Sequence, residues 1–231
     1  MPLRLVAVRF DTHDPSALAA FWAGLLRREI VGEESGTLLP GVGTQIGLRF
    51  VASPTAKLGL NCLHLHLTSS TLDDQRRTVE TSLALGGRHL DVGQSPEEDH
   101  VVLADPAGNA FCVIEPGNQF LANCGFLGEV SCDGSREVGL FWRDAFGWPL
   151  VWDRDGETAV QSPRGGTKIS WGGPREAPKI GSNRQRFELA APNLAAEVER
   201  LVSLGAAELG DRDGGVELAD PDGNEFWVHP S

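Results

Sequence analysis

Residues 105–113 read DPAGNAFCV and residues 220–228 read DPDGNEFWV, so one nine-residue pattern occurs twice, about half the chain apart. In each copy the Pro presets φ, the Gly accepts a positive φ, and the Asp and Asn can bond their own backbone. A strand-like run, at 101–104 and at 216–219, leads into each copy, and a second run leads out of it. The pattern therefore predicts two tight β-hairpins at equivalent points of an internal repeat.

The repeat extends upstream of these hairpins. The pair FW occurs at 21–22 and at 141–142, and the pair LG ends a helical pattern at 85–86 and at 204–205. The intervals between matching positions drift by a few residues, as a duplication followed by loop insertions and deletions would produce. We interpret the chain as a tandem repeat of one domain.

Each half shows the same order of expected elements twice: a strand, an amphipathic helix and three further strands. Helices are expected from Pro15 and at 72–85, 135–146 and 194–204. The prediction is an α+β fold of four βαβββ units in two tandem domains. The predicted boundaries are 1–118 for the first domain, 119–124 for a linker and 125–231 for the second domain.

Composition restricts the class of protein and of partner. The formal net charge of −12 argues against a nucleic-acid partner, because phosphate backbones require clustered Lys and Arg. No apolar run approaches the roughly 18–20 residues of a membrane span, so no membrane partner is expected. Four cysteines without a framework spacing, and an N-terminus without the pattern of a signal peptide, predict a cytoplasmic protein.

The βαβββ order, the DPxGN hairpin before a Phe-containing strand and the LG helix ends resemble the vicinal oxygen chelate superfamily. The likeness covers essentially the whole chain and is greatest to the glyoxalase-like and bleomycin-resistance-like branch. The resemblance implies mixed sheets curved into cups, in which a ligand binds or a reaction occurs. It does not imply one activity, since the members include lyases, epimerases, dioxygenases and drug-sequestering proteins.

The same resemblance implies where a metal would bind. Metal-using members place ligands on the first and final strands of paired units. In the first domain these positions fall at about 5–7, Arg49, His64 and Cys112, of which His64 matches a usual ligand. In the second domain they fall at about Leu127, Ser170, Arg186 and Trp227. The usual metal set is therefore absent from the second domain and incomplete in the first.

One cluster keeps a metal site open. Cys62, His64 and His66 alternate along an expected strand, so their side chains should share one face, with Cys112 on the neighbouring strand. A His/His/Cys set could hold a divalent metal ion. The alternative is that both histidines are polar residues that line the cup and that Cys112 is a small buried apolar residue.

The tryptophans favour ligand binding. Trp227 occupies a position where metal-using relatives carry a carboxylate, and an indole there suits stacking on a flat ligand. Trp152 and Trp171 could line the same cup or pack in the core. Arg49 and Arg186 are further candidate ligand contacts, and Glu188 and His64 are candidate acids or bases.

Two functions remain. The first is a protein without a cofactor that holds an apolar or aromatic small organic molecule, of the resistance or sequestration type. The alternative is an enzyme of the same superfamily, a lyase, isomerase or dioxygenase, with a metal at His64, His66 and Cys112. Whether the protein is an enzyme stays open, and a homodimer is possible because units in this superfamily pair within a chain or between chains.

Overall fold

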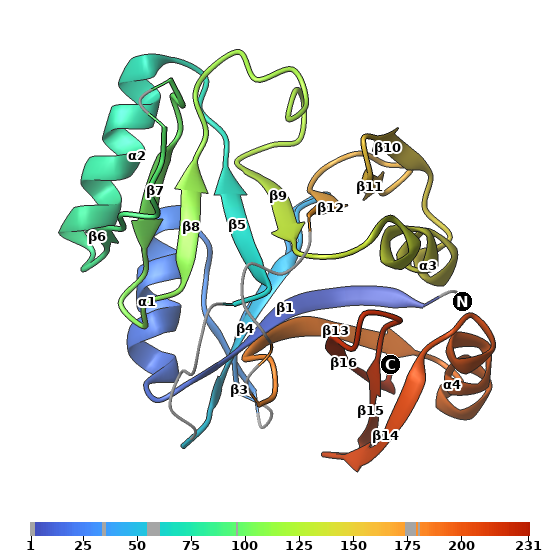
Figure 1. Ribbon diagram of the computed structural model, residues 1–231. Helices are drawn as coiled ribbons and strands as arrows, with labels where there is room; N and C mark the ends of the chain where they lie inside the picture. The colour runs from blue at the N-terminus through green and yellow to red at the C-terminus, as the bar shows by residue number, and fades with distance from the viewer. Residues whose placement is uncertain (1–2, 34–35, 55–60, 96, 174–178, 180) are drawn as a thin grey trace.

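The computed structural model describes residues 3–33, 36–54, 61–95, 97–173, 179 and 181–231. In this part of the chain, sixteen strands and four helices form four βαβββ units and two eight-stranded mixed sheets (Figure 1). The predicted α+β fold of four such units is confirmed.

Unit 1 consists of β1 (Arg4–Thr12), α1 (Pro15–Leu26), β2 (Val31–Glu33), β3 (Gly36–Leu39) and β4 (Gly47–Ala52). Unit 2 consists of β5 (Leu63–Leu67), α2 (Leu72–Ala84), β6 (Arg88–His89), β7 (Val101–Ala104) and β8 (Ala110–Val113). Unit 3 consists of β9 (Leu127–Cys132), α3 (Arg136–Phe146), β10 (Leu150–Arg154), β11 (Glu157–Gln161) and β12 (Lys168–Trp171). Unit 4 consists of β13 (Gln185–Ala191), α4 (Leu194–Ser203), β14 (Ala207–Arg212), β15 (Gly215–Ala219) and β16 (Glu225–Pro230).

The two sheets combine units from opposite halves of the sequence. Sheet A has the order β14-β15-β16-β13-β1-β4-β3-β2 and joins unit 4 to unit 1 through the antiparallel pair β1·β13. Sheet B has the order β10-β11-β12-β9-β5-β8-β7-β6 and joins unit 3 to unit 2 through the antiparallel pair β5·β9. Figure 1 shows these central strands, with the first and last units of the chain together in one sheet.

The repeated hairpin connects β7 to β8 and β15 to β16, as predicted. In the first copy the Asp105 carboxylate accepts a hydrogen bond from the Asn109 backbone N–H at 2.9 Å and another from Trp22 Nε1 at 3.2 Å. In the second copy Asp220 accepts the Trp142 indole N–H at the same 3.2 Å. Each turn therefore anchors the helix of the preceding unit, α1 or α3, which ties together the two units of each half.

Helix α1 begins where the sequence predicts. Asp14 caps it by accepting a hydrogen bond from the Ala17 backbone N–H at 2.9 Å, and Pro15 occupies the first helical position. Trp22 on this helix packs against Phe10 of β1 and Phe111 of β8, so α1 contacts both sheets. One continuous apolar core contains buried side chains from all four units.

Strand alternation sorts side chains between this core and the opposite face of each sheet. On β5 the side chains of Leu63, Leu65 and Leu67 are buried in the core, which places His64 and His66 on the other face. We call the face that carries His64 and His66 the cup face of sheet B. By the same alternation β1 and β13 carry Arg9 and Glu188 on the corresponding face of sheet A, which we call the cup face of sheet A.

Candidate functional site on the cup face of sheet B

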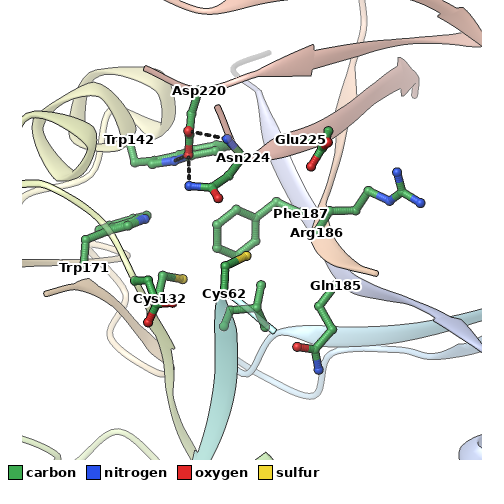
Figure 2. A pocket seen from close by; sticks show the side chains of 12 residues that line it. Cys62, Cys132, Trp142, Trp171, Gln185, Arg186, Phe187, Asp220, Asn224 and Glu225 are labelled. Atoms are coloured by element: carbon green, nitrogen blue, oxygen red, sulfur yellow. Dashed lines mark hydrogen bonds between the residues drawn. The ribbon is translucent and has the colours of Figure 1, made fainter. Parts of the chain in front are cut away.

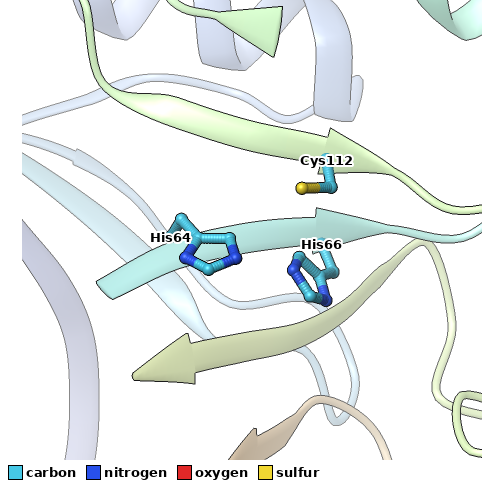
Figure 3. A group of neighbouring side chains, drawn as sticks. All are labelled: His64, His66 and Cys112. Atoms are coloured by element: carbon cyan, nitrogen blue, oxygen red, sulfur yellow. The ribbon is translucent and has the colours of Figure 1, made fainter. Parts of the chain in front are cut away.

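His64, His66 and Cys112 form a compact cluster on the cup face of sheet B (Figure 3). Cys112 on β8 lies opposite His66 in the parallel ladder with β5. The two imidazole rings have centroids 4.7 Å apart, and one ligand atom from each of the three residues lies within 4.8 Å of the others. The prediction that alternation and strand pairing bring these three residues together is confirmed.

Cys62 does not join this cluster, so its predicted place beside the histidines is wrong. It precedes β5, which begins at Leu63, and the period-two alternation of the strand does not extend to it. Instead Cys62 lines a small cavity of about 20 Å³ together with Cys132 and Phe187 (Figure 2).

Glu129 completes the cluster from unit 3. It lies opposite His66 in the antiparallel pair β5·β9, and its Oε2 is 2.6 Å from His66 Nδ1. Its other oxygen, Oε1, accepts a hydrogen bond of 2.5 Å from the Ser170 hydroxyl on β12. The Glu129 carboxylate is buried. His66, Glu129 and Ser170 therefore form a chain of polar contacts that crosses from unit 2 to unit 3.

From the resemblance, the ligand position on the first strand of the second half was expected at about Leu127. This expectation is wrong, because Glu129 is the residue of that strand that faces the histidines. The register of β5·β9 shifts between the pair His66/Glu129 and the pair Leu67/Leu127. This irregularity turns Leu127 into the core, where it is fully buried, and leaves Glu129 on the cup face. The available signal was a single glutamate inside the otherwise apolar and small-residue strand LGEVSC.

The electrostatics of the cluster give its two histidines different charges. Burial, the largest influence, favours the neutral ring of His66, but hydrogen bonds with Cys112 and Glu129 outweigh it and raise the pKa of His66 to about 10. Burial, aided by the nearby positive charge of His66, lowers the pKa of His64 to about 4. Burial would raise the pKa of Glu129, but its contacts with His66 and Ser170 lower it instead. At neutral pH an ion pair, His66 with Glu129, therefore lies beside a neutral His64.

These residues fit a metal ion of the zinc type. A neutral imidazole, a second imidazole and a thiolate are the nitrogen and sulfur ligands that Zn²⁺ prefers. Glu129 bonds His66 at Nδ1, so Nε2 is the nitrogen that remains for a metal, and ligating histidines commonly bond a carboxylate in this way. Three ligands of this kind leave a coordination position for a bound molecule.

A cavity of about 420 Å³ adjoins the cluster. His66, Glu129 and Ser170 line one part of it, and the aromatic side chains of Phe120 and Trp152 line another. The rings of Phe120 and Trp152 meet edge to face, with centroids 5.7 Å apart. A polar hydrogen-bonded region and an aromatic wall thus face one space, which suits a small organic ligand.

The predicted aromatic residues occupy different environments. Trp152 lines the cavity as proposed from the sequence, whereas Trp171 borders it from the core, where it is almost fully buried and stacks on Trp142 at 6.2 Å. Trp227 lies on the cup face of sheet A, where its Nε1 donates to the Arg212 carbonyl at 3.0 Å. The expectation that it shares a cup with Trp152 is therefore wrong, because units 3 and 4 lie in different sheets.

The remaining predicted residues gather on the cup face of sheet A. Arg49 Nε donates to Glu188 Oε2 at 2.6 Å, and Arg49 also pairs with Glu33 at 2.8 Å. Arg186 pairs with Glu217 at 2.6 Å and also with Asp11. Glu188, which the sequence presents without a partner, is fully buried and pairs with Arg49. This face therefore carries a network of ion pairs that link unit 1 to unit 4.

Among the described residues, no helix is both long and apolar enough to cross a membrane.

Comparisons with known proteins agree with this architecture. A family profile described as a glyoxalase-like domain matches residues 7–114 and 129–229. Glyoxalase I from Zea mays is similar in structure, with a TM-score of 0.68 and 15% sequence identity over 98% of this chain and 92% of that chain. A Bacillus subtilis protein has a TM-score of 0.62 and 12% identity over 98% of this chain and 84% of its own.

No curated protein matches the chain. At these identities the likeness to the solved structures shows the fold alone. The family profile covers most of the sequence in two successive stretches, one in each half. The chain therefore belongs to the glyoxalase-like domain family and carries two tandem copies of that domain.

Proposed function

We propose that the protein binds a small organic molecule, apolar or aromatic, in the cavity on the cup face of sheet B, as a resistance- or sequestration-type binding protein would. The observation that carries this proposal is the cavity of about 420 Å³ with Phe120 and Trp152 on one side. Aromatic walls contribute apolar contact and stacking, and a few polar groups fix a ligand's orientation. His66, Glu129 and Ser170 supply those polar groups.

The cup face of sheet A supports binding less well. Three buried arginines, Arg9, Arg49 and Arg186, lie there with acidic partners, so their charges are already compensated within the protein. A ligand would have to replace these ion pairs. We therefore assign ligand binding to sheet B.

Titration calorimetry with 8-anilinonaphthalene-1-sulfonate and with indole tests the proposal. We expect the wild-type protein to bind at least one of these planar probes, and Trp152→Ala to weaken that binding by up to about tenfold, since stacking on an aromatic contributes roughly 0.5–1.5 kcal/mol. Val151→Ala is the matched control, because Val151 is the exposed neighbour of Trp152 on β10. Failure of both probes to bind, or an unchanged affinity in Trp152→Ala, would contradict the proposal.

A second candidate function rests on the cluster itself. His64, His66 and Cys112 would hold a divalent metal ion, Glu129 would orient His66, and Ser170 would hold Glu129. When bound, such an ion supplies a Lewis acid to an oxygen of the ligand, which the lyases, isomerases and dioxygenases of this superfamily could use. The supporting observation is that the three ligand atoms lie within 4.8 Å of one another, with a carboxylate on His66 Nδ1.

Elemental analysis of protein purified without chelator or an affinity metal tests this second function. We expect about one zinc, iron, nickel or manganese ion per chain, lost in His64→Ala, since removing one of three ligands should abolish tight binding. His89→Ala is the control, because His89 is exposed on β6. If the protein takes up no metal after incubation with excess ions, the metal function is excluded.

A further inference from the structure

The connection between units 2 and 3 passes over the cup face of sheet B. We call residues 118–124 the cover segment. Leu121 and Cys124 of this segment belong to one buried apolar cluster with Cys112, and Phe120 packs against Trp152. The cavity is lined in part by Asn118, Phe120 and Leu121. The segment thus forms one wall of the cavity, because units 2 and 3 share a sheet and the chain must cross it.

A side chain from the other sheet holds the end of the cover segment. Gln45 lies between β3 and β4 of unit 1, and its Nε2 donates to the Cys124 carbonyl at 2.6 Å. Its Oε1 accepts a hydrogen bond from the Leu127 backbone N–H at 2.7 Å. Gly125, between these two contacts, has a φ of +79°, and a Cβ there would lie 2.8 Å from Gln45 Nε2. The backbone and the amide of Gln45 therefore fit each other closely.

The loop that carries Gln45 is itself fixed to unit 3. The Ile46 backbone N–H donates to the Thr167 hydroxyl at 3.2 Å, and this hydroxyl donates to the Leu127 carbonyl at 2.8 Å. The Thr167 backbone N–H also reaches the Thr44 carbonyl at 3.3 Å. The two neighbours of Gln45, Thr44 and Ile46, are therefore both hydrogen-bonded to Thr167. Because its loop is fixed in this way, Gln45 can determine the position of the cover segment.

A second contact holds the middle of the segment. The Lys168 ammonium lies 4.3 Å from the centroid of the Phe120 ring and also bonds the Phe120 carbonyl. A cation over an aromatic face is attractive, so Lys168 holds the ring against Trp152. The Phe120 ring, with Trp152 and Lys168 against it, therefore borders this side of the cavity.

From these contacts we propose that the cover segment selects which molecules enter the cavity, with Phe120 as the specificity-determining residue and Gln45 as a positioning residue that acts through the segment. The proposal rests on ligand binding in this cavity and adds to it a control by unit 1, which belongs to the other sheet. In the described part of the chain, Gln45 is not among the residues that line the cavity. A change at Gln45 therefore tests the segment without replacing any side chain that lines the cavity.

Hydrogen exchange tests the positioning role without any ligand. In Gln45→Leu the backbone N–H of Leu127 loses its acceptor and the Cys124 carbonyl loses its donor. We expect exchange at Leu127 and across residues 118–124 to speed up about tenfold, since the change removes both hydrogen bonds that Gln45 makes to this backbone. Val42→Ala is the control, because Val42 is an exposed residue of the same loop. Unchanged exchange in Gln45→Leu overturns the proposal.

Stopped-flow binding of 8-anilinonaphthalene-1-sulfonate and indole tests the selecting role. We expect Gln45→Leu to raise the association and dissociation rates of both probes about tenfold, and Phe120→Ala to favour the larger probe relative to indole. Faster exchange without faster probe kinetics overturns the selecting role and leaves the proposed function standing. Wild-type protein that binds neither probe overturns the proposed function, while the exchange experiment still decides the role of Gln45.

Discussion

At the scale of single residues, the contact between His66 and Glu129 defines the candidate site. Glu129 joins the unit 3 side of sheet B to the histidines of unit 2 and leaves His66 Nε2 as the nitrogen available to Cys112, a metal or a ligand. The contact also helps to explain why two histidines on one strand carry different charges. Burial acts on both rings, and His66 is the one that bonds Cys112 and has a carboxylate on its nitrogen.

Glu129→Gln should lower the pKa of His66 from about 10, because the variant removes the negative charge that opposes burial. A histidine pKa raised by folding stabilises the protein fully below the ordinary value of 6.5, and this stabilisation disappears as the pH rises through about 10. The free energy of unfolding of the wild type should therefore exceed that of the variant by about 2 kcal/mol near pH 6, with a smaller difference near pH 10. NMR titration of His66 and urea unfolding at both pH values measure these effects.

Glu157→Gln is the matched control, since Glu157 is an exposed carboxylate at the edge of the same cavity. We expect this variant to leave the pKa of His66 unchanged. An unshifted titration of His66 in Glu129→Gln would show that Glu129 does not determine the charge of the ring.

Glu188 should give the opposite pH dependence on sheet A. Burial would raise its pKa, but the contact with His229 and the hydrogen bond from Arg49 lower it below the ordinary value of 4.5. The resulting stabilisation is present above pH 4.5 and is lost as the pH falls through the folded-state pKa. Glu188→Gln should cost about 2 kcal/mol at pH 7, because buried Arg49 loses one of its two carboxylate partners and keeps Glu33. Urea unfolding at pH 7 and at pH 3 should show this difference shrinking at the lower pH.

The surface variant Glu208→Gln is the control for Glu188→Gln. Its free energy of unfolding should differ from that of the wild type by no more than about 0.5 kcal/mol at either pH. A Glu188→Gln penalty that stays constant from pH 7 to pH 3 would mean that the carboxylate charge is not its cause.

The sequence predicted part of this residue-scale picture. His64, His66 and Cys112 were predictable together because alternation and strand pairing follow from local pattern. Glu129 was missed because a register shift inside β5·β9, at Gly128, moves it relative to Leu127, and the signal in the sequence was limited to the glutamate and the glycine beside it. Cys62 was placed wrongly because the strand begins one residue later than the alternation suggests.

At the scale of elements, the contact between α3 and β11 is closer than ordinary helix packing. A Cβ on Gly139 would lie 1.8 Å from Thr158 Oγ1, so only glycine allows the helix to approach this strand. Gly139→Ala should destabilise the protein by about 1–3 kcal/mol through overpacking, although alanine favours helix. Urea unfolding measures the change.

Gly24→Ala on α1 is the matched control. Its Cβ would first meet Leu85 Cδ1 at 3.0 Å, and that side chain is 38% exposed and can move. There the better helix propensity of alanine should leave stability unchanged or raise it by up to about 1 kcal/mol. Equal stability of Gly139→Ala and the wild type would show that α3 can shift away from β11.

The elements themselves were largely predictable, and their pairing was not. Caps such as Asp14 with Pro15, and hairpins such as residues 105–109, depend on neighbouring residues and are therefore visible in the sequence. Which unit pairs with which depends on contacts between residues far apart in the sequence, such as Arg4 with Ala190 in β1·β13 and His66 with Glu129 in β5·β9. The residue pattern within one unit carries little information about that choice.

At the scale of the whole molecule, charged side chains link the units that share a sheet. Unit 1 carries Arg49 on its cup face, and unit 4 supplies Glu188 to it. Unit 2 carries His66, and unit 3 supplies Glu129. Arg9 of unit 1 and Arg186 of unit 4 lie opposite each other in β1·β13, and Asp11 pairs with both of them. Like charges opposite each other destabilise a sheet, so Asp11 compensates the one pair of arginines that this arrangement brings together.

This arrangement predicts that the two tandem halves unfold together. Each sheet contains one unit of each half, one apolar core spans all four units, and neither half keeps a complete sheet when the other unfolds. Five of the six tryptophans lie in the second half, so tryptophan fluorescence reports mainly on that half, whereas far-UV circular dichroism reports on the whole chain. The two signals should give the same urea midpoint.

A core substitution in the first half gives the sharper form of this prediction. Leu48→Ala on β4 removes a fully buried side chain from unit 1 and should cost about 2–5 kcal/mol. Because unit 1 shares sheet A with unit 4, the fluorescence midpoint of the second half should fall as far as the dichroism midpoint. A fluorescence midpoint that stays at its wild-type value while the dichroism midpoint falls would mean that the halves unfold independently, and that the β1·β13 ladder contributes little to the stability of unit 4.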